Sequence, residues 1–458
     1  MVATSIIAIP IVISKLSIEE INVWFLFAAV VSLSQGVLLG FNSTFVRFIV
    51  YSYSGVKIRE FQQIKIKKEN INPDEFDKNE FSAIYHMMVK VYNILTLFYT
   101  SILVLAGYAV LRSPISALSS ASEGWIAWII IAISTTLSFR LGVFQIFLEG
   151  IGKVALVQRI KGAVSLVGLV MIITVLLITP TLISIVLVYQ IVALAIAFSI
   201  SFYSYRERRL LVDLNYSYAN KRLLRSNIFT SAWKSGITTI SANTIQHISS
   251  IAVSQLFPPA QSASFLFTKR IFDIMEVFTQ TTFQARLPTI AKIRSRGDIK
   301  ALIPYLRQTQ YFAYAVFIAG FIVLITVGNK LLSMMNTNVL LGDQLLIILF
   351  SFSIIFRRWL GFSMAISNQS NHLIDFIIIP LTGLSFFILT YALYPLMGVH
   401  VFPFAQIFSI ILVIPFVAKM YYPVIYTSFF KYEIKTLIPI VGLLILINLL
   451  FYLNPIQG

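Results

Sequence analysis

Two stretches of the chain share one pattern at a separation of 240 residues: ISKLSIEEINVWFLF at 13–27 and VSQLFPPAQSASFLF at 253–267. In each copy, a four-residue segment ending in leucine is followed by eight residues and then by Phe-Leu-Phe. A further match, STFVR at 43–47 against TTFQAR at 281–286, is one residue out of step, as a single insertion or deletion would produce. The sequence therefore predicts two similar halves in parallel orientation.

Composition places both halves in a membrane. Hydrophobic residues make up 58% of the chain and charged residues only 12%, whereas about 25% of the residues of a soluble domain are charged. The chain has no cysteine, and its four histidines show no metal-ligand spacing, so we expect no disulfide, no metal site and no cofactor. The apolar segment at 1–14 lacks a basic start and a small-residue cleavage site, and we interpret it as part of the protein and not as a signal peptide.

Apolar stretches of about 20 residues predict the membrane helices. The predicted fold is an all-α polytopic membrane protein with two pseudo-symmetric six-helix bundles and 12 to 13 transmembrane helices. We expect an N-terminal bundle at 1–205, a cytoplasmic linker at 206–226, a C-terminal bundle at 227–430 and an extra hydrophobic helix at 431–458. The predicted segments are 1–15, 21–46, 82–111, 125–149, 162–178, 182–204, 227–256, 260–286, 309–328, 343–366, 373–395, 402–423 and 436–453.

The distribution of Lys and Arg predicts the orientation, because cytoplasmic loops carry an excess of these residues. The loops on one side, at 47–81, 150–161, 205–226, 287–308 and 419–435, hold 24 of them. The opposite side holds Lys15, Arg112 and Lys330. We therefore expect a cytoplasmic N-terminus. Most of the net charge of +17 is explained by topology, and no nucleic-acid partner is expected.

Charged residues inside the predicted helices are the candidate functional residues. A Lys or Arg at mid-bilayer costs about 2.5–3.5 kcal/mol, so it normally faces a partner or a wet cavity. Basic residues outnumber acidic ones by four, which predicts binding of an anion. The basic residues are Lys90, Arg140, Lys234, Lys269, Arg270, Arg286, Arg357 and Arg358, and the acidic ones, which are possible proton carriers for ion coupling, are Glu149, Asp273, Glu276 and Asp375.

Spacing along the chain divides these residues further. Lys269 and Arg270 can pair with Asp273 at i,i+4 and i,i+3 on one helix. Arg140, Arg357 and Arg358 have no acid within four positions, so their compensation must come from another helix or from a ligand. Arg286, near a helix end, is expected to extend to the interface. The predicted substrate-binding residues are Arg140, Lys234, Lys269, Arg270, Arg357 and Arg358, which are suited to phosphate or pyrophosphate.

The stretch PIVISKLSIEEINVWFLFAAVVSLSQGVLLGFNSTFVRFIVYSYSG at 10–55 resembles the first two helices of bacterial polysaccharide flippases, in its Leu-Ser-x-Glu-Glu turn, its Trp-Phe helix start and its Gly-Phe-Asn end. These flippases belong to the multidrug/oligosaccharidyl-lipid/polysaccharide (MOP) exporter superfamily, and the O-antigen (Wzx-type) branch is the most similar. The resemblance implies two six-helix bundles around a cationic cavity. The thirteenth segment departs from the twelve helices usual in that branch.

The same resemblance implies a function and partners. The expected substrate is an undecaprenyl-pyrophosphate-linked oligosaccharide, an O-antigen or capsule repeat unit, passed from the inner to the outer leaflet of the bacterial inner membrane by alternating access. Membrane lipids, and the polymerase and chain-length regulator of the same pathway, are the expected partners, and no enzymatic activity is expected.

Two other functions remain as alternatives. A drug antiporter of the same superfamily would need unpaired acids for organic cations, and the excess of basic residues argues against it. An integral-membrane glycan polymerase would need large outer loops, whereas the predicted outer loops are short. The sequence contains no catalytic motif, and no phosphate-binding loop such as GxxxxGKS is present.

Overall fold

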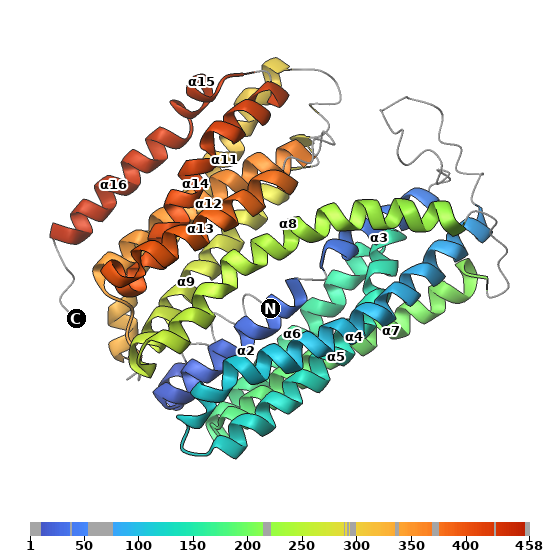
Figure 1. Cartoon of the computed structure of the whole chain (residues 1–458), viewed down its shortest axis with the longest axis horizontal. Coiled ribbons are helices and arrows are strands. Elements are labelled where there is room, and N and C mark those ends of the chain that lie inside the picture. Colours follow the sequence, from blue (N-terminus) through green and yellow to red (C-terminus); the bar gives the residue numbers. More distant parts are fainter. Residues whose placement is uncertain are drawn as a thin grey trace. The chain divides into compact units, whose positions relative to one another are not determined.

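The computed structural model describes residues 11–36, 39–53, 77–213, 221–287, 289–290, 293, 299–334, 339–368, 375–425 and 427–453. These residues form helices joined by short turns, with no strand among them (Figure 1). The longer helices are α2 (Ile18–Gly36), α3 (Leu39–Tyr53), α4 (Lys78–Ser116), α5 (Ala121–Gly150), α6 (Val154–Ile178), α7 (Leu182–Leu211), α8 (Lys221–Leu256), α9 (Pro259–Gln284), α11 (Ile299–Met334), α12 (Gln344–Asn368), α13 (Asp375–Met397), α14 (Val401–Met420) and α16 (Leu437–Leu453). The described residues also form the short helices η3 (Gly398–His400), η4 (Tyr422–Ile425) and α15 (Phe429–Glu433).

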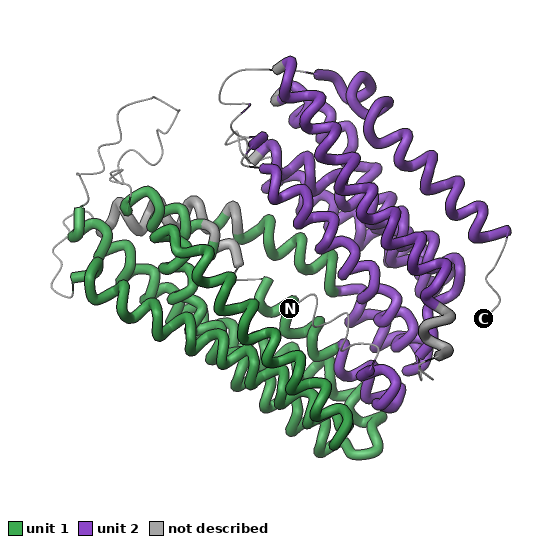
Figure 2. Tube along the Cα trace, turned by 180° about the vertical axis from the view of Figure 1, so that it is seen from behind, with its two compact units in different colours: residues 1, 3–8, 26–247 green, residues 2, 9–25, 248–458 purple. Residues whose placement is uncertain are grey.

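The chain divides into two compact units (Figure 2). The first consists mainly of residues 26–247, and the second of residues 248–458 together with 9–25. The division near residue 248 falls inside α8, whereas the sequence places the boundary in a linker at 206–226, which remains a prediction. Both copies of the repeated Phe-Leu-Phe, at 25–27 and 265–267, are buried.

In the first unit, α5 packs against α4, α6, α7 and α3. A tight turn links α5 to α6: Gly152 has φ of 83°, and the amide of Lys153 donates to the carbonyl oxygen of Leu148 at 2.9 Å. Glycine suits this left-handed position because it has no Cβ. The turn lets α6 begin at Val154. The prediction of a loop at 150–161 is therefore wrong from Val154 onward, because the basic residues Arg159 and Lys161 lie within α6.

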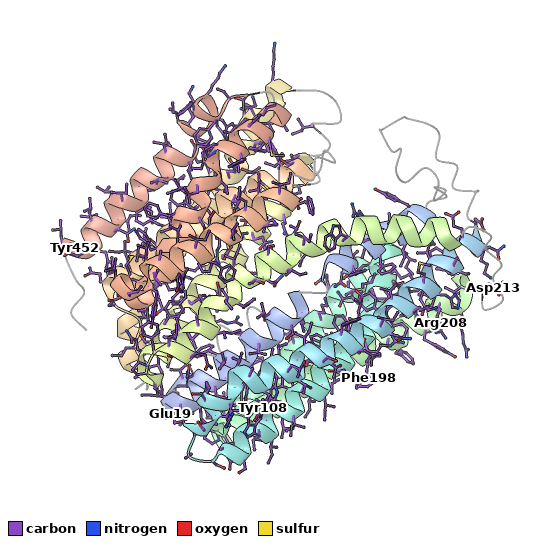
Figure 3. The ribbon with its side chains drawn as sticks, in the orientation of Figure 1. Glu19, Tyr108, Phe198, Arg208, Asp213 and Tyr452 are labelled. Atoms are coloured by element: carbon purple, nitrogen blue, oxygen red, sulfur yellow. The ribbon has the colours of Figure 1, made fainter. Side chains whose placement is uncertain are left out.

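The outward surface of the first unit is apolar along the middle of its helices and basic near one end. Phe198, midway along α7, is 53% exposed, while Arg208 lies near the end of the same helix (Figure 3). Among the described residues, eight helical segments are long and apolar enough to cross a membrane. Apolar side chains exposed in this pattern are suited to contact with lipid.

In the second unit, α9 packs between α11 and α12, and α12 also contacts α14 and α16. Aromatic rings fill the space on one side of α9: Phe272 lies 5.5 Å from Phe350 and 6.1 Å from Phe321, measured between ring centroids. Phe272, Phe317 and Phe321 are fully buried. This packing fixes α9 against its neighbours.

The thirteenth predicted segment forms α16, which packs on α11 and α12. Two polar contacts hold it: Asn448 Nδ2 donates to Ser351 Oγ at 3.2 Å, and Gln344 Nε2 donates to the carbonyl oxygen of Phe451 at 2.8 Å. At 1.5 Å per residue, its 17 residues extend about 26 Å, slightly less than the hydrocarbon core of a bilayer.

A buried carboxylate anchors the connection that leads from α14 to α16. Glu433 is 2% exposed. It accepts hydrogen bonds from Trp359 Nε1 at 2.9 Å, from the Tyr422 hydroxyl at 2.5 Å and from the amide of Leu437 at 3.2 Å. Burial raises the pKa of Glu433, and these three donors partly oppose the shift.

Replacing Glu433 tests this anchor. We expect Glu433→Ala to lower the unfolding free energy by about 1–3 kcal/mol for each buried donor left without an acceptor. Glu433→Gln keeps an acceptor oxygen, so its effect should be much smaller. Because the pKa of Glu433 is raised in the folded protein, its contribution to stability is lost as the pH rises. Glu433→Gln should therefore gain stability relative to the wild type as the pH increases. Thermal unfolding of the purified protein at several pH values measures both effects, and equal losses for Ala and Gln would contradict them.

Candidate functional site: a buried ion network between α9 and α12

Five of the predicted charged residues meet in the second unit. Lys269, Asp273 and Glu276 lie at i, i+4 and i+7 on α9, a spacing that places them on one helix face. Arg357 and Arg358 are consecutive on α12, which packs against α9. The five side chains form one network, which we call the α9–α12 ion network.

Both carboxylates of the α9–α12 ion network contact two cations. Asp273 binds Lys269 Nζ at 2.8 Å and Arg357 NH2 at 3.5 Å. Glu276 binds Arg358 NH2 at 2.5 Å through Oε1 and Arg357 through Oε2. Arg357 therefore bridges the two acids, and the network ties α12 to α9.

The α9–α12 ion network is largely shielded from solvent, since its five side chains are only 8–16% exposed. Removing charges from water is expensive, and the cost is repaid only where opposite charges and hydrogen bonds are well placed. Three cations face two carboxylates, which leaves one formal positive charge. The Nε atoms of Arg357 and Arg358 are buried and have no hydrogen-bond partner within the described part of the chain. The network thus retains both positive charge and unused N–H donors.

Neighbouring polar contacts hold the two helices in place. The hydroxyl of Thr268, directly before Lys269, accepts a hydrogen bond from the amide of Gly342 at 2.7 Å. Ser353, one turn before Arg357, donates to Gln406 Oε1 on α14 at 2.5 Å. Lys269 lies ten residues after Pro259, about 15 Å along α9, and Arg357 lies thirteen after Gln344, about 20 Å along α12. Both positions lie near the middle of their helices, and α12 is one of the helices apolar enough to cross a membrane.

The other predicted residues lie on α5, α8, α9 and α13. Arg270 follows Lys269 on α9, and Asp375 begins α13, where its carboxylate accepts a hydrogen bond from the amide of Phe376. Glu149 on α5 accepts a hydrogen bond from Gln145 at 2.7 Å. Lys234 lies on α8, but its side chain falls outside the described residues. Arg140 belongs to the first unit, where it lines a groove between α4 and α5.

From sequence spacing alone, the negative charge that neutralises Arg357 and Arg358 could come from another helix or from a ligand. In the structure, another helix supplies it, through Asp273 and Glu276. The i,i+4 pairing of Lys269 with Asp273 is confirmed. Two features escaped the sequence analysis: the anchoring role of Glu433, and the threonine and aromatic side chains that accompany Arg140. A signal for the second was present, because Thr96 and Thr100 lie one helical turn apart in an otherwise apolar helix.

Comparison with known proteins identifies the fold. No model of a known protein family matches the sequence, and no curated protein matches it. An inward-facing multidrug resistance MATE family transporter of the MOP superfamily matches with a TM-score of 0.64 at 13% identity, over 93% of this chain and 96% of that one. The chain has the same all-helical fold as this transporter.

Two further solved structures agree with this fold. The MATE multidrug transporter DinF-BH matches with a TM-score of 0.56 at 13% identity, over 93% of each chain. A MOP superfamily transporter from Pyrococcus furiosus, described by the reverse polarity of its binding pocket, matches with a TM-score of 0.51 at 12% identity, over 92% of this chain and 95% of that one. The prediction of an all-α, MATE-like, multi-pass membrane protein is confirmed.

The charge balance of the α9–α12 ion network predicts an unequal response to two substitutions. Glu276→Gln removes the acid shared by both arginines and leaves three cations with one carboxylate, so we expect a loss of about 3–5 kcal/mol. Arg357→Met leaves Lys269 with Asp273 and Arg358 with Glu276, two balanced pairs, and should cost less. Thermal unfolding in detergent measures both variants. A larger loss for Arg357→Met would contradict this account of the network.

Proposed function

We propose that the protein is a flippase that moves an anionic lipid-linked oligosaccharide across a membrane. The expected substrate is an undecaprenyl-pyrophosphate-linked repeat unit of an O-antigen or capsule, carried from the inner to the outer leaflet by alternating access. The observation that carries the proposal is the excess positive charge of the α9–α12 ion network. The protein acts as a transporter and not as an enzyme.

The chemistry of the network supports an anionic substrate. Arginine binds phosphate oxygens through two parallel N–H groups, and Arg357 and Arg358 each keep a buried Nε–H without a partner in the described residues. A phosphate or pyrophosphate group can accept from these donors and compete with Glu276 for the guanidinium groups. The substrate would thereby neutralise the remaining positive charge inside the apolar interior.

The fold by itself is equally compatible with drug antiport, because the solved neighbours include multidrug transporters. The charge of the site separates the two functions. A site for an organic cation needs a carboxylate that is not neutralised, whereas Asp273 and Glu276 each contact two cations. The network therefore favours the anionic substrate.

Coupling to an ion gradient uses the same carboxylates in this proposal. Protonation of Asp273 or Glu276 would release an arginine for the substrate, and departure of the substrate would restore the ion pair. Glu149 and Asp375 are the other acids available for this role. We further propose a location in the bacterial inner membrane with the N-terminus in the cytoplasm, and operation beside the polymerase and chain-length regulator of the same pathway.

Substitutions of Lys269 test whether the excess charge serves transport. Lys269→Met leaves Asp273 paired with Arg357 and removes the excess, so we expect translocation of a lipid-linked oligosaccharide in proteoliposomes to fall about tenfold or more, while the protein remains folded. Lys269→Arg keeps the charge and should remain active. The double variant Lys269→Met with Asp273→Asn again has two arginines and one carboxylate, and we expect it to regain activity over the single variant.

The assay measures how quickly the glycan of a labelled substrate becomes accessible on the far side of the vesicle, and protein insertion is verified in parallel. Wild-type transport by Lys269→Met would contradict the proposed role of the excess charge. Transport of an organic cation in place of the lipid-linked glycan would favour the antiporter.

A further inference from the structure

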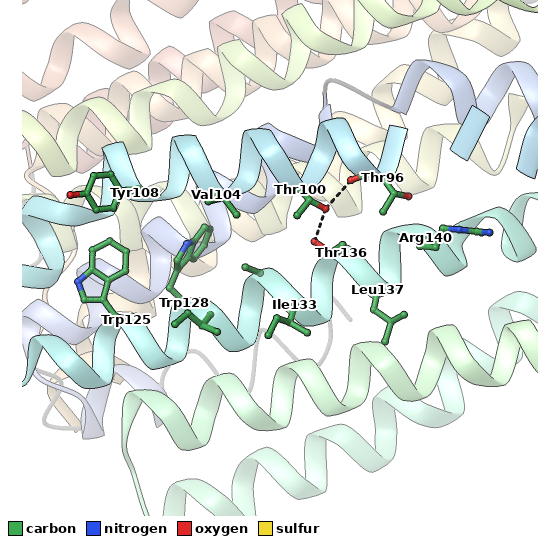
Figure 4. A pocket seen from close by; sticks show the side chains of 12 residues that line it. Thr96, Thr100, Val104, Tyr108, Trp125, Trp128, Ile133, Thr136, Leu137 and Arg140 are labelled. Carbon is green, nitrogen blue, oxygen red and sulfur yellow. Dashed lines mark hydrogen bonds between the residues drawn. The ribbon is translucent and has the colours of Figure 1, made fainter. Parts of the chain in front are cut away.

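A groove runs between α4 and α5 in the first unit, with a volume of about 710 Å³ (Figure 4). Its two ends differ in chemistry. Trp125 and Tyr108 stack at one end with ring centroids 5.8 Å apart. Arg140 and Thr96 lie at the other end, where the guanidinium of Arg140 points away from the aromatic pair.

Close packing of the two helices forms the floor of the groove. Trp128 lies directly against Gly107, where an added Cβ would come within 2.2 Å of the indole ring. Trp128 also stacks on Phe27 at 5.5 Å and is only 4% exposed. Only a glycine permits this approach, so the tryptophan ring is held in the floor and the space above it stays open.

The walls of the groove are exposed apolar side chains. Val104, Ile129 and Ile133 are 51%, 54% and 65% exposed and line the groove. Leu97 and Leu105, which are each 71% exposed, continue the apolar surface along α4. In a membrane-spanning helix such a surface meets lipid chains, so an occupant can enter this groove from the bilayer.

Polar groups interrupt this lipid-facing surface. Thr100 and Thr136 approach each other across the groove at 3.3 Å between their hydroxyl oxygens, and Thr96 lies one turn from Thr100. Arg140 forms no salt bridge to any described residue. A cation in this position is costly unless an anion meets it. The groove therefore combines an apolar channel with a cationic end.

The groove has room for a hydrocarbon chain. Trp125 and Arg140 are 15 residues apart on α5, about 22 Å. With about 30 Å³ for each water-sized group, the volume of 710 Å³ holds on the order of 24 such groups. This is enough for part of one long hydrocarbon chain.

We propose that the α4–α5 groove binds a single-chain lipid phosphate, with the phosphate or pyrophosphate on Arg140 and the chain lying towards Trp125 and Tyr108. Thr136, whose hydroxyl contacts only that of Thr100 among the described residues, can donate to the polar end of the lipid, whereas the hydroxyl of Thr96 donates to the carbonyl oxygen of Tyr92 at 2.6 Å. The choice of occupant rests on the proposed function, because a polyprenyl pyrophosphate is such a lipid. The groove would hold the chain of the substrate at the lipid-facing surface of the first unit.

Photo-crosslinking tests this site without any translocation step. The full-length protein is purified into nanodiscs and labelled with a photoreactive polyprenyl phosphate, and the modified peptides are mapped. We expect labelling within residues 96–108 and 125–140, and competition by unlabelled polyprenyl phosphate. Labelling confined to other helices, or stronger competition by the two-chain lipid phosphatidylglycerol, would overturn the proposal.

Substitutions separate the two ends of the groove. Arg140→Gln should weaken polyprenyl phosphate binding about tenfold and leave binding of the uncharged polyprenol unchanged, whereas Ile133→Trp, which fills the channel, should weaken both. The matched control is Lys90→Gln, which removes an exposed cation from α4 outside the groove and should have no effect. Equal effects of Arg140→Gln and Lys90→Gln would overturn the assignment.

Binding and transport can fail independently in these experiments. If the wild-type protein translocates no glycan while the groove is still labelled, the proposed function is contradicted. The groove would then be a lipid-binding site in a protein that transports a different substrate. Intact translocation with no labelling of the groove would contradict the proposed lipid site but would be consistent with the proposed function.

Discussion

The buried charges between α9 and α12 are tolerated because each carboxylate of α9 meets two cations, at least one of them from α12. In the apolar interior of a membrane protein, an unpaired charge costs several kcal/mol, and a pair repays this cost only with good geometry. Arg357 contacts both Asp273 and Glu276 and thereby fixes the register of α12 on α9. The aromatic packing around Phe272 and the contact between Ser353 and Gln406 hold the same helices from other sides. The positive charge that remains is consequently held on a rigid part of the fold, where a substrate anion can use it.

The two units offer different types of binding site, and both are suited to parts of a lipid-linked anion. The second unit offers a buried network with excess positive charge, suited to a phosphate group. The first unit offers a lipid-facing groove with one cation at its end, suited to a hydrocarbon chain with a charged head. A lipid-linked glycan contains both parts. Solved multidrug transporters share this fold at 13% identity, so the substrate must be inferred from these side chains and not from the fold.

The sequence was sufficient for the membrane class and for most helices, because a run of about 20 apolar residues is a strong signal. Charge inside such runs also singled out the five residues that meet in the α9–α12 ion network, whose role in substrate binding remains a prediction. The sequence was not sufficient where the answer depends on distance in space. Arg357 and Glu276 are 81 positions apart, and only the packing of α12 on α9 shows that they pair. Arg159 and Lys161 were assigned to a loop because they are basic and precede an apolar segment. The end of a helix that continues beyond the bilayer has the same composition as a loop, so composition does not distinguish the two. The α4–α5 groove depends on the contact of Gly107 with Trp128, which no pattern along the chain reveals.

The most direct test of the account is the location of the lipid-linked glycan in host cells that lack this protein. The gene is deleted, and the accumulating lipid-linked repeat units are assigned to the cytoplasmic or the outer leaflet by their accessibility to a membrane-impermeant reagent. The account predicts single repeat units trapped on the cytoplasmic leaflet, with recovery when the wild-type protein is restored. Unpolymerised units on the outer leaflet, or an unchanged glycan together with altered drug sensitivity, would contradict it.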